Sequence, residues 1–553
     1  MIDGTRRTRT RLTSALGLGL VAVLSLSACA APEPGSKTGT AGSSSLMLAA
    51  DNGSPTFVKN FNPFVIEKRT TATIINEPLM VVNALDGKST NFLQTNYTQP
   101  DAKTIVSDIR EGVTWSDGEE FTADDVVFTY NLLKEFPALD STGVWSRLES
   151  VNAEGQKVTF TLHAEDSSAP IIVLAVPIVA EHLWADVADP ATFTNESPIG
   201  TGPYTLGDFN ANQYKLEKNP DYWQADKVAA EQLVLPAANS QLDIVNNGYD
   251  WAYAFMSDVE NTWVAADEGN QFWFPAGGTV AIAPNLTKAP YDDPNFRKGM
   301  SLALERDSIA DNASEGTVDA AGQQGLLLPT QAEWLTDAIP DEGMVTQDTA
   351  AAEAAFAEAG YTIQDGKLVD ADGNQATMTI TTPNGWTDWL RAVQEIQKQY
   401  TAIGIDVKIN QPQPAAYFQA VQNGDFDVAM TSFGGNGSVY QGYYNLLSSD
   451  FLQPVGTSAS SNYQRYSNPE VDAMLTEFRT TVDEARQKEL AGELQEVMYN
   501  DVPVISVYYA GLWGLFSDKS FTGWPDADNP YMTPTPYTSA ALVILTTITK
   551  ADG

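Results

Sequence analysis

Cysteine and histidine are almost absent from this chain of 553 residues, which has one cysteine, Cys29, and two histidines, His163 and His182. A single thiol excludes an intramolecular disulfide and any metal site built from several cysteines. The two histidines do not form an HExxH motif, so the zinc-binding helix of a metalloprotease is absent. The sequence also has no GxSxG motif, which would place a nucleophilic serine on a sharp turn. We therefore expect no catalytic residue, no cofactor and no metal site. A secreted hydrolase stays a remote alternative.

Basic residues are also scarce. The chain has 31 Lys and Arg against 71 Asp and Glu, a formal net charge of −40. Such a surface repels nucleic acid and anionic lipid headgroups, so we expect neither as a partner. Hydrophobic residues make up 43% of the chain and charged residues 18%, which is typical of a folded protein rather than a disordered one.

Long hydrophobic runs are missing, and the one apolar stretch that stands out is short and close to the N-terminus. It runs from Leu16 to Leu26 behind four arginines and leads into Leu26-Ser27-Ala28-Cys29. The pattern predicts a signal peptide over residues 1–28, because about 20 apolar residues would be needed to span a membrane. It leaves Sec and twin-arginine export both open.

The only cysteine follows Leu-Ser-Ala directly, which resembles a bacterial lipobox. The resemblance implies a lipid on Cys29, and the small polar residues up to position 45 predict a flexible tether over 29–45. We expect an exported protein held to the outer face of the cell membrane, at the cell surface or in a periplasmic space, through this anchor alone. A simple cleavable signal with an incidental cysteine is the alternative.

Strand and helix signals alternate along the rest of the chain. Residues 377–381 and 405–409 alternate as strands, and 387–402 between them has helical periodicity, which together predict a parallel βαβ unit. Asn468-Pro469 predicts the start of a helix that runs to Thr480. No period of 20 to 50 residues repeats, which excludes a solenoid or propeller. The sequence thus predicts an α/β protein with more than one lobe.

A long segment resembles one known family. Residues 109–133 read IREGVTWSDGEEFTADDVVFTYNLL, which is similar to the signature of the bacterial family 5 solute-binding proteins, the dipeptide, oligopeptide, nickel and oligosaccharide receptors of ABC importers. The resemblance covers the chain from about residue 46 to the end. Further landmarks follow in the family's order: residues 60–64 (NFNPF), 77–79 (EPL), 200–204 (GTGPY), 219–223 (NPDYW), 290–298 and 466–472.

The resemblance implies a two-lobed periplasmic-binding-protein clamp of type II with an extra subdomain inserted in lobe I. It places lobe I at 46–75, 198–283 and 506–553, the inserted subdomain at 76–197 and lobe II at 284–505. Crossing strands near 279–285 and 505–508 would form the hinge. A monomer would close on a small ligand and present it to the permease subunits and their ATPases.

The residues favour a sugar as this ligand. The family's peptide receptors hold the ligand's amino group with an aspartate after a lobe II strand, but no aspartate occurs here between Asp427 and Asp450. Nickel receptors depend on histidine. Residues 522–531 look like the corresponding segment of cello- and manno-oligosaccharide receptors, and aromatic rings suit sugar faces. We therefore predict a β-linked oligosaccharide, with an oligopeptide or dipeptide as the alternative. The candidate ligand-binding residues are Asn62, Trp251, Phe255, Trp386, Trp389, Tyr440 and Trp513.

Overall fold

The computed structural model describes residues 44–51, 56–65, 67–237 and 240–551, so Cys29, the signal peptide and nearly all of the tether lie outside the described residues. Its strands form three larger sheets of seven, four and five strands. Each sheet has its own hydrophobic core. We call the bodies around them lobe I, the inserted subdomain and lobe II; their residue boundaries stay predictions.

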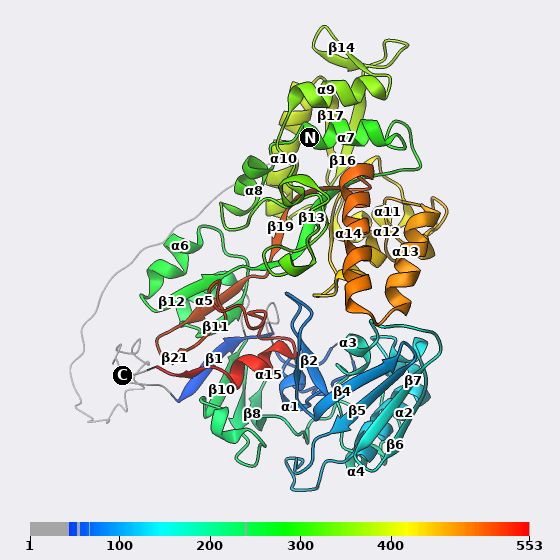
Figure 1. Cartoon of the computed structure of the whole chain (residues 1–553). Helices are drawn as coiled ribbons and strands as arrows, with labels where there is room; N and C mark the ends of the chain where they lie inside the picture. The colour runs from blue at the N-terminus through cyan, green and yellow to red at the C-terminus, as the bar shows by residue number, and fades with distance from the viewer. Residues whose placement is uncertain (1–43, 52–55, 66, 238–239, 552–553) are drawn as a thin grey trace, which may run out of the picture. The chain divides into compact units, whose positions relative to one another are not determined.

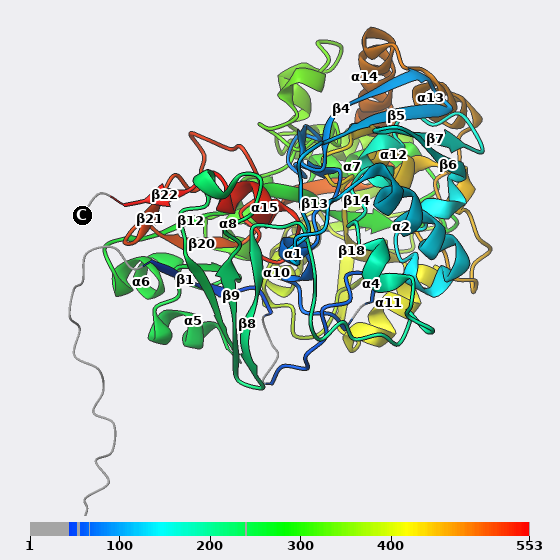
Figure 2. The same ribbon diagram turned by 90° about the horizontal axis from the view of Figure 1, so that it is seen from below.

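Lobe I contains the seven-stranded sheet, in the order β12-β20-β11-β1-β10-β9-β8. β1 pairs in parallel with both β10 and β11, and β8 and β9 form a long antiparallel hairpin (Figure 2). Leu46 and Leu48 of β1 point into the core, as the alternation of a half-buried strand requires. The strands are β1 Ser45–Ala49, β8 Tyr204–Asn210, β9 Gln213–Lys218, β10 Gln232–Pro236, β11 Trp251–Tyr253, β12 Asn270–Trp273 and β20 Gly514–Ser517. Helices α1 Ala72–Ile75, α5 Gln241–Asn247, α6 Val259–Thr262 and α15 Ala540–Leu545, with the pair β21 Phe521–Thr522 and β22 Thr549–Lys550, complete it.

The inserted subdomain contains the four-stranded sheet β4-β5-β7-β6, which packs against helix α2 (Figure 1). Thr122 and Asp125 form a capping box that starts α2, so this carboxylate has a structural role. Trp115 of the family signature is buried in the same core. The elements are β2 Met80–Val82, β3 Ser89–Asn91, β4 Gln94–Asp101, β5 Thr104–Ile109, α2 Ala123–Glu135, β6 Leu148–Glu154, β7 Lys157–Leu162, α3 Pro170–Val173 and α4 Glu181–Trp184.

Lobe II contains the five-stranded sheet β17-β16-β18-β13-β19. The predicted βαβ unit is confirmed: β16 spans Thr377–Thr381, α10 spans Thr387–Ala402, and β17 pairs with β16 in parallel. β17 occupies Asp406–Asn410, one residue later than predicted. The remaining strands are β13 Ala276–Pro284, β18 Val428–Phe433 and β19 Ile505–Gly511, with the small hairpin β14 Thr362–Gln364 and β15 Lys367–Val369.

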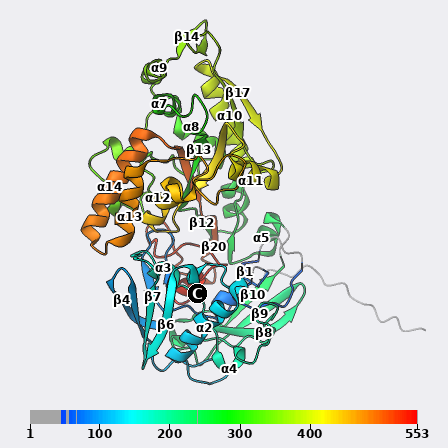
Figure 3. The same cartoon turned by 90° about the vertical axis from the view of Figure 1, so that its right-hand side faces the viewer.

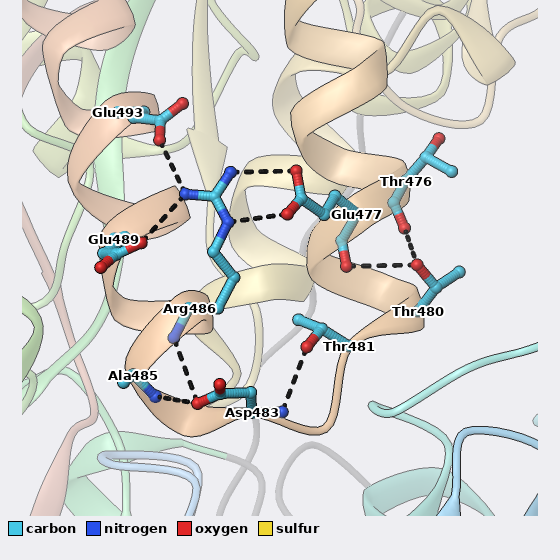
Figure 4. A network of polar contacts seen from close by, with 9 residues as sticks. All are labelled: Thr476, Glu477, Thr480, Thr481, Asp483, Ala485, Arg486, Glu489 and Glu493. Atoms are coloured by element: carbon cyan, nitrogen blue, oxygen red, sulfur yellow. Dashed lines mark hydrogen bonds and ion pairs between the residues drawn. The ribbon is translucent and has the colours of Figure 1, made fainter.

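Helices surround this sheet, and two of them form an antiparallel pair at its side (Figure 3). The pair is α13 Pro469–Thr480, which begins and ends as the sequence predicts, and α14 Glu484–Asp501. Arg486 of α14 joins them, because its guanidinium contacts both carboxylate oxygens of Glu477 at 2.7 and 2.9 Å and also Glu489 and Glu493 (Figure 4). The other helices are α7 Pro294–Leu302, α8 Arg306–Ser314, α9 Thr349–Glu358, α11 Pro414–Asn423 and α12 Val439–Leu447.

Two short segments connect the lobe I sheet to the lobe II sheet, at the ends of the paired strands β13 and β19. Residues 279–284 and 505–508, in the segments predicted to form the hinge, pair within the lobe II sheet. The links to the lobe I sheet are residues 274–275 and 512–513, between β12 and β13 and between β19 and β20. Leu512 N donates to the Pro275 carbonyl at 2.8 Å, so the two links are bonded to each other. The residues predicted to form the hinge thus lie in the paired strands β13 and β19, next to these links, and their role as a hinge stays a prediction.

Candidate ligand-binding site

A cavity of about 650 Å³ lies where the inserted subdomain, lobe II and the C-terminal part of lobe I meet. A volume of this size is typical of small-molecule sites. The inserted subdomain contributes Val82, Ala84, Arg147, Ile171, Ile172 and Ala175; lobe II contributes Gly435, Asn436, Gln441 and Asn445; the last part of the chain contributes Leu512, Thr533, Thr535, Tyr537, Thr538, Ser539 and Ala540.

The wall of this cavity is neutral and rich in hydrogen-bonding groups. Five hydroxyls and three amides line it, from Thr533, Thr535, Tyr537, Thr538, Ser539, Asn436, Gln441 and Asn445. Arg147 is its one charged member, and no carboxylate occurs among the described residues that line it. The Arg147 guanidinium forms an ion pair with Asp166, whose other oxygen accepts a hydrogen bond from Ser168 Oγ at 2.6 Å. Even this charge is therefore already balanced by a partner.

Residues 533–539 form the most polar wall. The Thr533 and Thr535 hydroxyls lie 3.2 Å apart, and the Thr535 and Thr538 hydroxyls 2.9 Å apart, so the three form a chain of hydrogen-bonding groups. The Tyr537 ring packs edge-on against Tyr253, with centroids 5.0 Å apart. Burial raises the pKa of the Tyr537 hydroxyl, which therefore stays a neutral donor and acceptor at physiological pH.

The opposite wall comes from helix α12 and the loop before it. Gln441 and Asn445 lie one turn apart on α12, and Gln441 Nε2 donates to Asn445 Oδ1 at 2.6 Å. Ser438 caps this helix by accepting from the Gln441 backbone amide at 3.2 Å. The capped helix start thus fixes the positions of two amides that line the same cavity as the hydroxyls of residues 533–539.

Two predicted ligand-binding residues are core residues in the structure. Trp251 is 0% exposed, and its indole N–H donates to the Pro534 carbonyl at 3.1 Å. Asn62 is also 0% exposed, and its amide donates to the carbonyls of Pro190 and Phe193. The prediction that these two side chains touch ligand is wrong for this structure, because each is covered by protein. Trp251 instead supports the wall from behind through Pro534.

The other predicted aromatic residues do not line this cavity and pack in clusters of their own. Phe255 and Trp513 pack against each other at 4.9 Å, next to the lining residue Leu512. Trp386 and Trp389, at the start of α10, contact each other at 4.9 Å. Trp386 is 37% exposed, whereas Trp389 is 7% exposed and belongs to the lobe II core. Contact of these residues with ligand stays a prediction.

Tyr440 lies in a separate, smaller cavity of about 180 Å³, together with Trp334 and Phe478.

Three parts of the cavity lining were not predicted from the sequence: Arg147, the α12 amides and residues 533–539. The last of these carried a readable signal, the run Thr-Pro-Thr-Pro-Tyr-Thr-Ser, in which prolines keep polar side chains out of regular structure. Gln441 and Asn445 carried none, because polar residues spaced by four also occur on solvent-exposed helix faces.

The described residues hold no group of three or more His, Cys, Asp and Glu arranged to bind a metal ion. Across the same residues, no helix combines the length and apolar character that crossing a membrane requires. Two carboxylates of the inserted subdomain have structural partners: Asp125 caps α2, and Asp117 lies 2.8 Å from the His182 ring nitrogen.

Comparisons with known proteins agree with this arrangement. The sequence profile of the bacterial extracellular solute-binding proteins, family 5, middle region, matches residues 90–452. The oligopeptide-binding protein AppA of Bacillus subtilis is 25% identical over 72% of this chain and 74% of its own length. The peptidoglycan-binding protein YepA of Agrobacterium fabrum is 24% identical over 86% of both chains.

Solved structures show the same fold. A periplasmic oligopeptide-binding protein of an ABC transporter from Thermotoga maritima superimposes with a TM-score of 0.80 at 26% identity, covering 92% of this chain and 99% of its own. A mannohexaose-bound structure of that protein gives a TM-score of 0.71 over the same shares. Since the family profile covers well over half of the chain, this protein belongs to the bacterial extracellular solute-binding proteins of family 5, the two-lobed α/β receptors of ABC importers, which bind solutes and are not enzymes.

Proposed function

We propose that this receptor captures an uncharged, β-linked oligosaccharide in the cavity lined by Arg147, Gln441, Asn445 and residues 533–539. One observation carries the proposal: eight neutral hydrogen-bonding side chains line the cavity, while its one charge is paired with Asp166. Hydroxyl groups of a sugar both donate and accept, and threonine, serine, asparagine and glutamine side chains match both roles.

A peptide would make different demands on the same wall. Its free amino group carries a positive charge, and a charge removed from water needs an opposite partner. Among the described lining residues there is no carboxylate to supply one. Apolar side chains of the lining, Ile171, Ile172 and Leu512, and the Tyr537 ring instead offer surface for the apolar faces of sugar rings.

One of the similar structures supports an oligosaccharide as the ligand. The Thermotoga protein, 26% identical to this chain, has a structure with mannohexaose bound. The segment 522–531 contributes indirectly, because Trp524 is buried and donates its indole N–H to the carbonyl of Phe521 at 2.9 Å. The Trp524 ring also packs against Trp251 with centroids 5.5 Å apart, and Trp251 in turn donates to the Pro534 carbonyl.

Ligand binding by the purified chain tests the proposal. We expect β-linked gluco- or manno-oligosaccharides to raise the melting temperature, since ligand at a hundred times its dissociation constant stabilises by about 2.7 kcal/mol. Di- to pentapeptides should leave it unchanged. In the variant Thr535→Val, which keeps the side-chain shape and removes a hydroxyl, sugar binding should weaken. A response to peptides with none to sugars would refute the proposal.

A peptide ligand is the second candidate, favoured by relatives named for oligopeptides and by Arg147, whose guanidinium would donate hydrogen bonds to a peptide carboxylate. Arg147→Gln separates the two candidates. For a peptide it should abolish most of the affinity, because it removes the one cation of the lining. For a neutral sugar the loss should stay within a few fold.

We further propose that the protein is exported and acts as a monomer with permease subunits and their ATPases. The anchor would be a lipid on Cys29, which lies outside the described residues. What supports the anchor is the sequence Leu26-Ser27-Ala28-Cys29 and the polar residues that follow it. Labelling with radioactive palmitate tests it directly.

A further inference from the structure

We propose that the 180 Å³ cavity lined by Trp334, Tyr440 and Phe478 is a second chamber of the ligand site, which takes the terminal ring of a longer oligosaccharide. The inference rests on the proposed function and adds a determinant of ligand length to it. We call the 650 Å³ cavity the main cavity and the smaller one the side chamber.

The side chamber adjoins the main cavity. Ile171 lines both. The loop before α12 also passes between them, since Asn436 lines the main cavity and its neighbour Gly437 lines the side chamber. The two cavities are therefore adjacent, and under this proposal a linear ligand which fills the main cavity extends past Ile171 into the side chamber.

The chamber offers aromatic faces beside small polar groups. Trp334 is partly exposed and packs against Phe478 with ring centroids 6.1 Å apart, and Tyr440 packs edge-on against Phe478 at 5.4 Å. Ser167, Ser168 and Gln487 add neutral hydrogen-bonding groups to the lining. Its one carboxylate, Asp86, is paired with Lys88 at 3.1 Å. An aromatic surface with neutral polar groups around it matches the apolar face and hydroxyl edge of a sugar ring.

Hydrogen bonds between the inserted subdomain and lobe II close one side of the chamber. The Ser167 backbone amide donates to the Arg479 carbonyl at 2.6 Å, and Gln487 Nε2 donates to Ser167 Oγ at 3.2 Å. The Arg486 network fixes this wall, because Arg486 and its partner Glu477 are the direct neighbours of the lining residues Gln487 and Phe478 (Figure 4). The wall is thus held in place from behind, outside the chamber.

Two glycines bound another side. A Cβ atom on Gly437 would lie 2.6 Å from both the Asn83 carbonyl oxygen and the Gly87 nitrogen, and Gly437 has φ +88°. Only glycine adopts this conformation without strain and lets the two backbones approach so closely. The inserted subdomain and lobe II therefore meet here through backbone, and no side chain of this pair projects into the chamber.

Chain-length dependence tests the inference. We would measure dissociation constants by calorimetry for linear β-linked mannose and glucose oligomers, from disaccharides to hexasaccharides. The variant Trp334→Ala should lose about tenfold in affinity for pentamers and hexamers, and less than about twofold for dimers. Trp334→Phe, which keeps an aromatic face, should retain most of the affinity. The backbone hydrogen bonds of residue 334, from its own amide to Gln331 and from Gln495 Nε2 to its carbonyl, survive both changes.

Trp145→Ala is the matched control. Trp145 is partly exposed, as Trp334 is. A lysine lies over each ring, Lys134 at 4.2 Å from Trp145 and Lys488 at 5.7 Å from Trp334, but Trp145 lines neither cavity. It should leave every oligomer's affinity unchanged. If Trp334→Ala loses the same affinity for oligomers of every length, or loses none, the side chamber is not part of the ligand site. The proposal that the protein binds oligosaccharides would be unaffected by that result. If no oligomer binds the unaltered chain, the proposed function falls and this inference falls with it.

Discussion

Glu77 gives the chain a built-in dependence of stability on pH. The residue follows α1, at the junction of lobe I and the inserted subdomain, and it is completely buried. Its Oε1 accepts hydrogen bonds from the Tyr222 hydroxyl at 2.8 Å and from the Trp223 indole at 3.3 Å, whereas its Oε2 has no hydrogen-bond partner among the described residues. Burial is the main cause that raises the Glu77 pKa from 4.5 to about 7.

The sign of the effect follows from linkage. A carboxyl whose pKa is higher in the folded protein favours folding when it is protonated, so its contribution is present below pH 4.5 and is lost as the pH rises through about 7. At about 1.36 kcal/mol for each pKa unit, the loss amounts to about 3 kcal/mol. An unfolding entropy of about 2.1 cal/mol/K per residue gives about 1 kcal/mol/K for the whole chain. A loss of about 3 kcal/mol therefore lowers the melting temperature by about 3 °C.

Glu77→Gln isolates this contribution. Glutamine keeps an acceptor for Tyr222 and Trp223 but carries no charge, so it mimics the protonated side chain. Melting curves should show equal stability of variant and unaltered chain at pH 4.5 and a gap of about 3 °C in favour of the variant at pH 8. Glu111→Gln, at an exposed position nearby, should show no such gap. A gap that is constant with pH, or a less stable variant at pH 8, would refute the reasoning.

Three further predictions concern other regions. Gly437→Ala should separate the inserted subdomain from lobe II and increase the radius of gyration measured by X-ray scattering, whereas Gly456→Ala, at φ +92° with nothing within 4 Å of its Cβ, should not; equal radii for both would contradict the close backbone contact. Trp389→Ala should destabilise the ligand-free protein by about 3 kcal/mol in urea unfolding, while the more exposed Trp386→Ala should cost less than about 1 kcal/mol; the reverse order would contradict these burials. Cys29→Ser should abolish incorporation of labelled fatty acid, and a variant that still incorporates label would disprove the lipid anchor.

Much of the local structure could be predicted from the sequence, because local signals are set by neighbours along the chain. The alternation in residues 377–381 and the helical period of 387–402 depend on side chains two to four positions apart, and both elements appear within a residue of their predicted bounds. Asn468 caps α13 through its side chain, as its position before Pro469 predicts. The family signature at 109–133 likewise indicated the two-lobed fold, which the solved structures of relatives show.

The ligand cavity could not be predicted in this way, because it depends on contacts between distant parts of the chain. Arg147 precedes Gln441 by 294 residues and Gln441 precedes Thr535 by 94, and only the packing of three sheets brings them around one cavity. A tryptophan in a sequence shows a large apolar ring but not which side of a sheet it occupies. Trp251 is in the core since its strand is paired on both sides, by β1 and β20, and the C-terminal segment covers its ring. The sequence by itself determined the elements and the family; the tertiary structure decided which polar side chains face the cavity, because burial is a property of non-local packing.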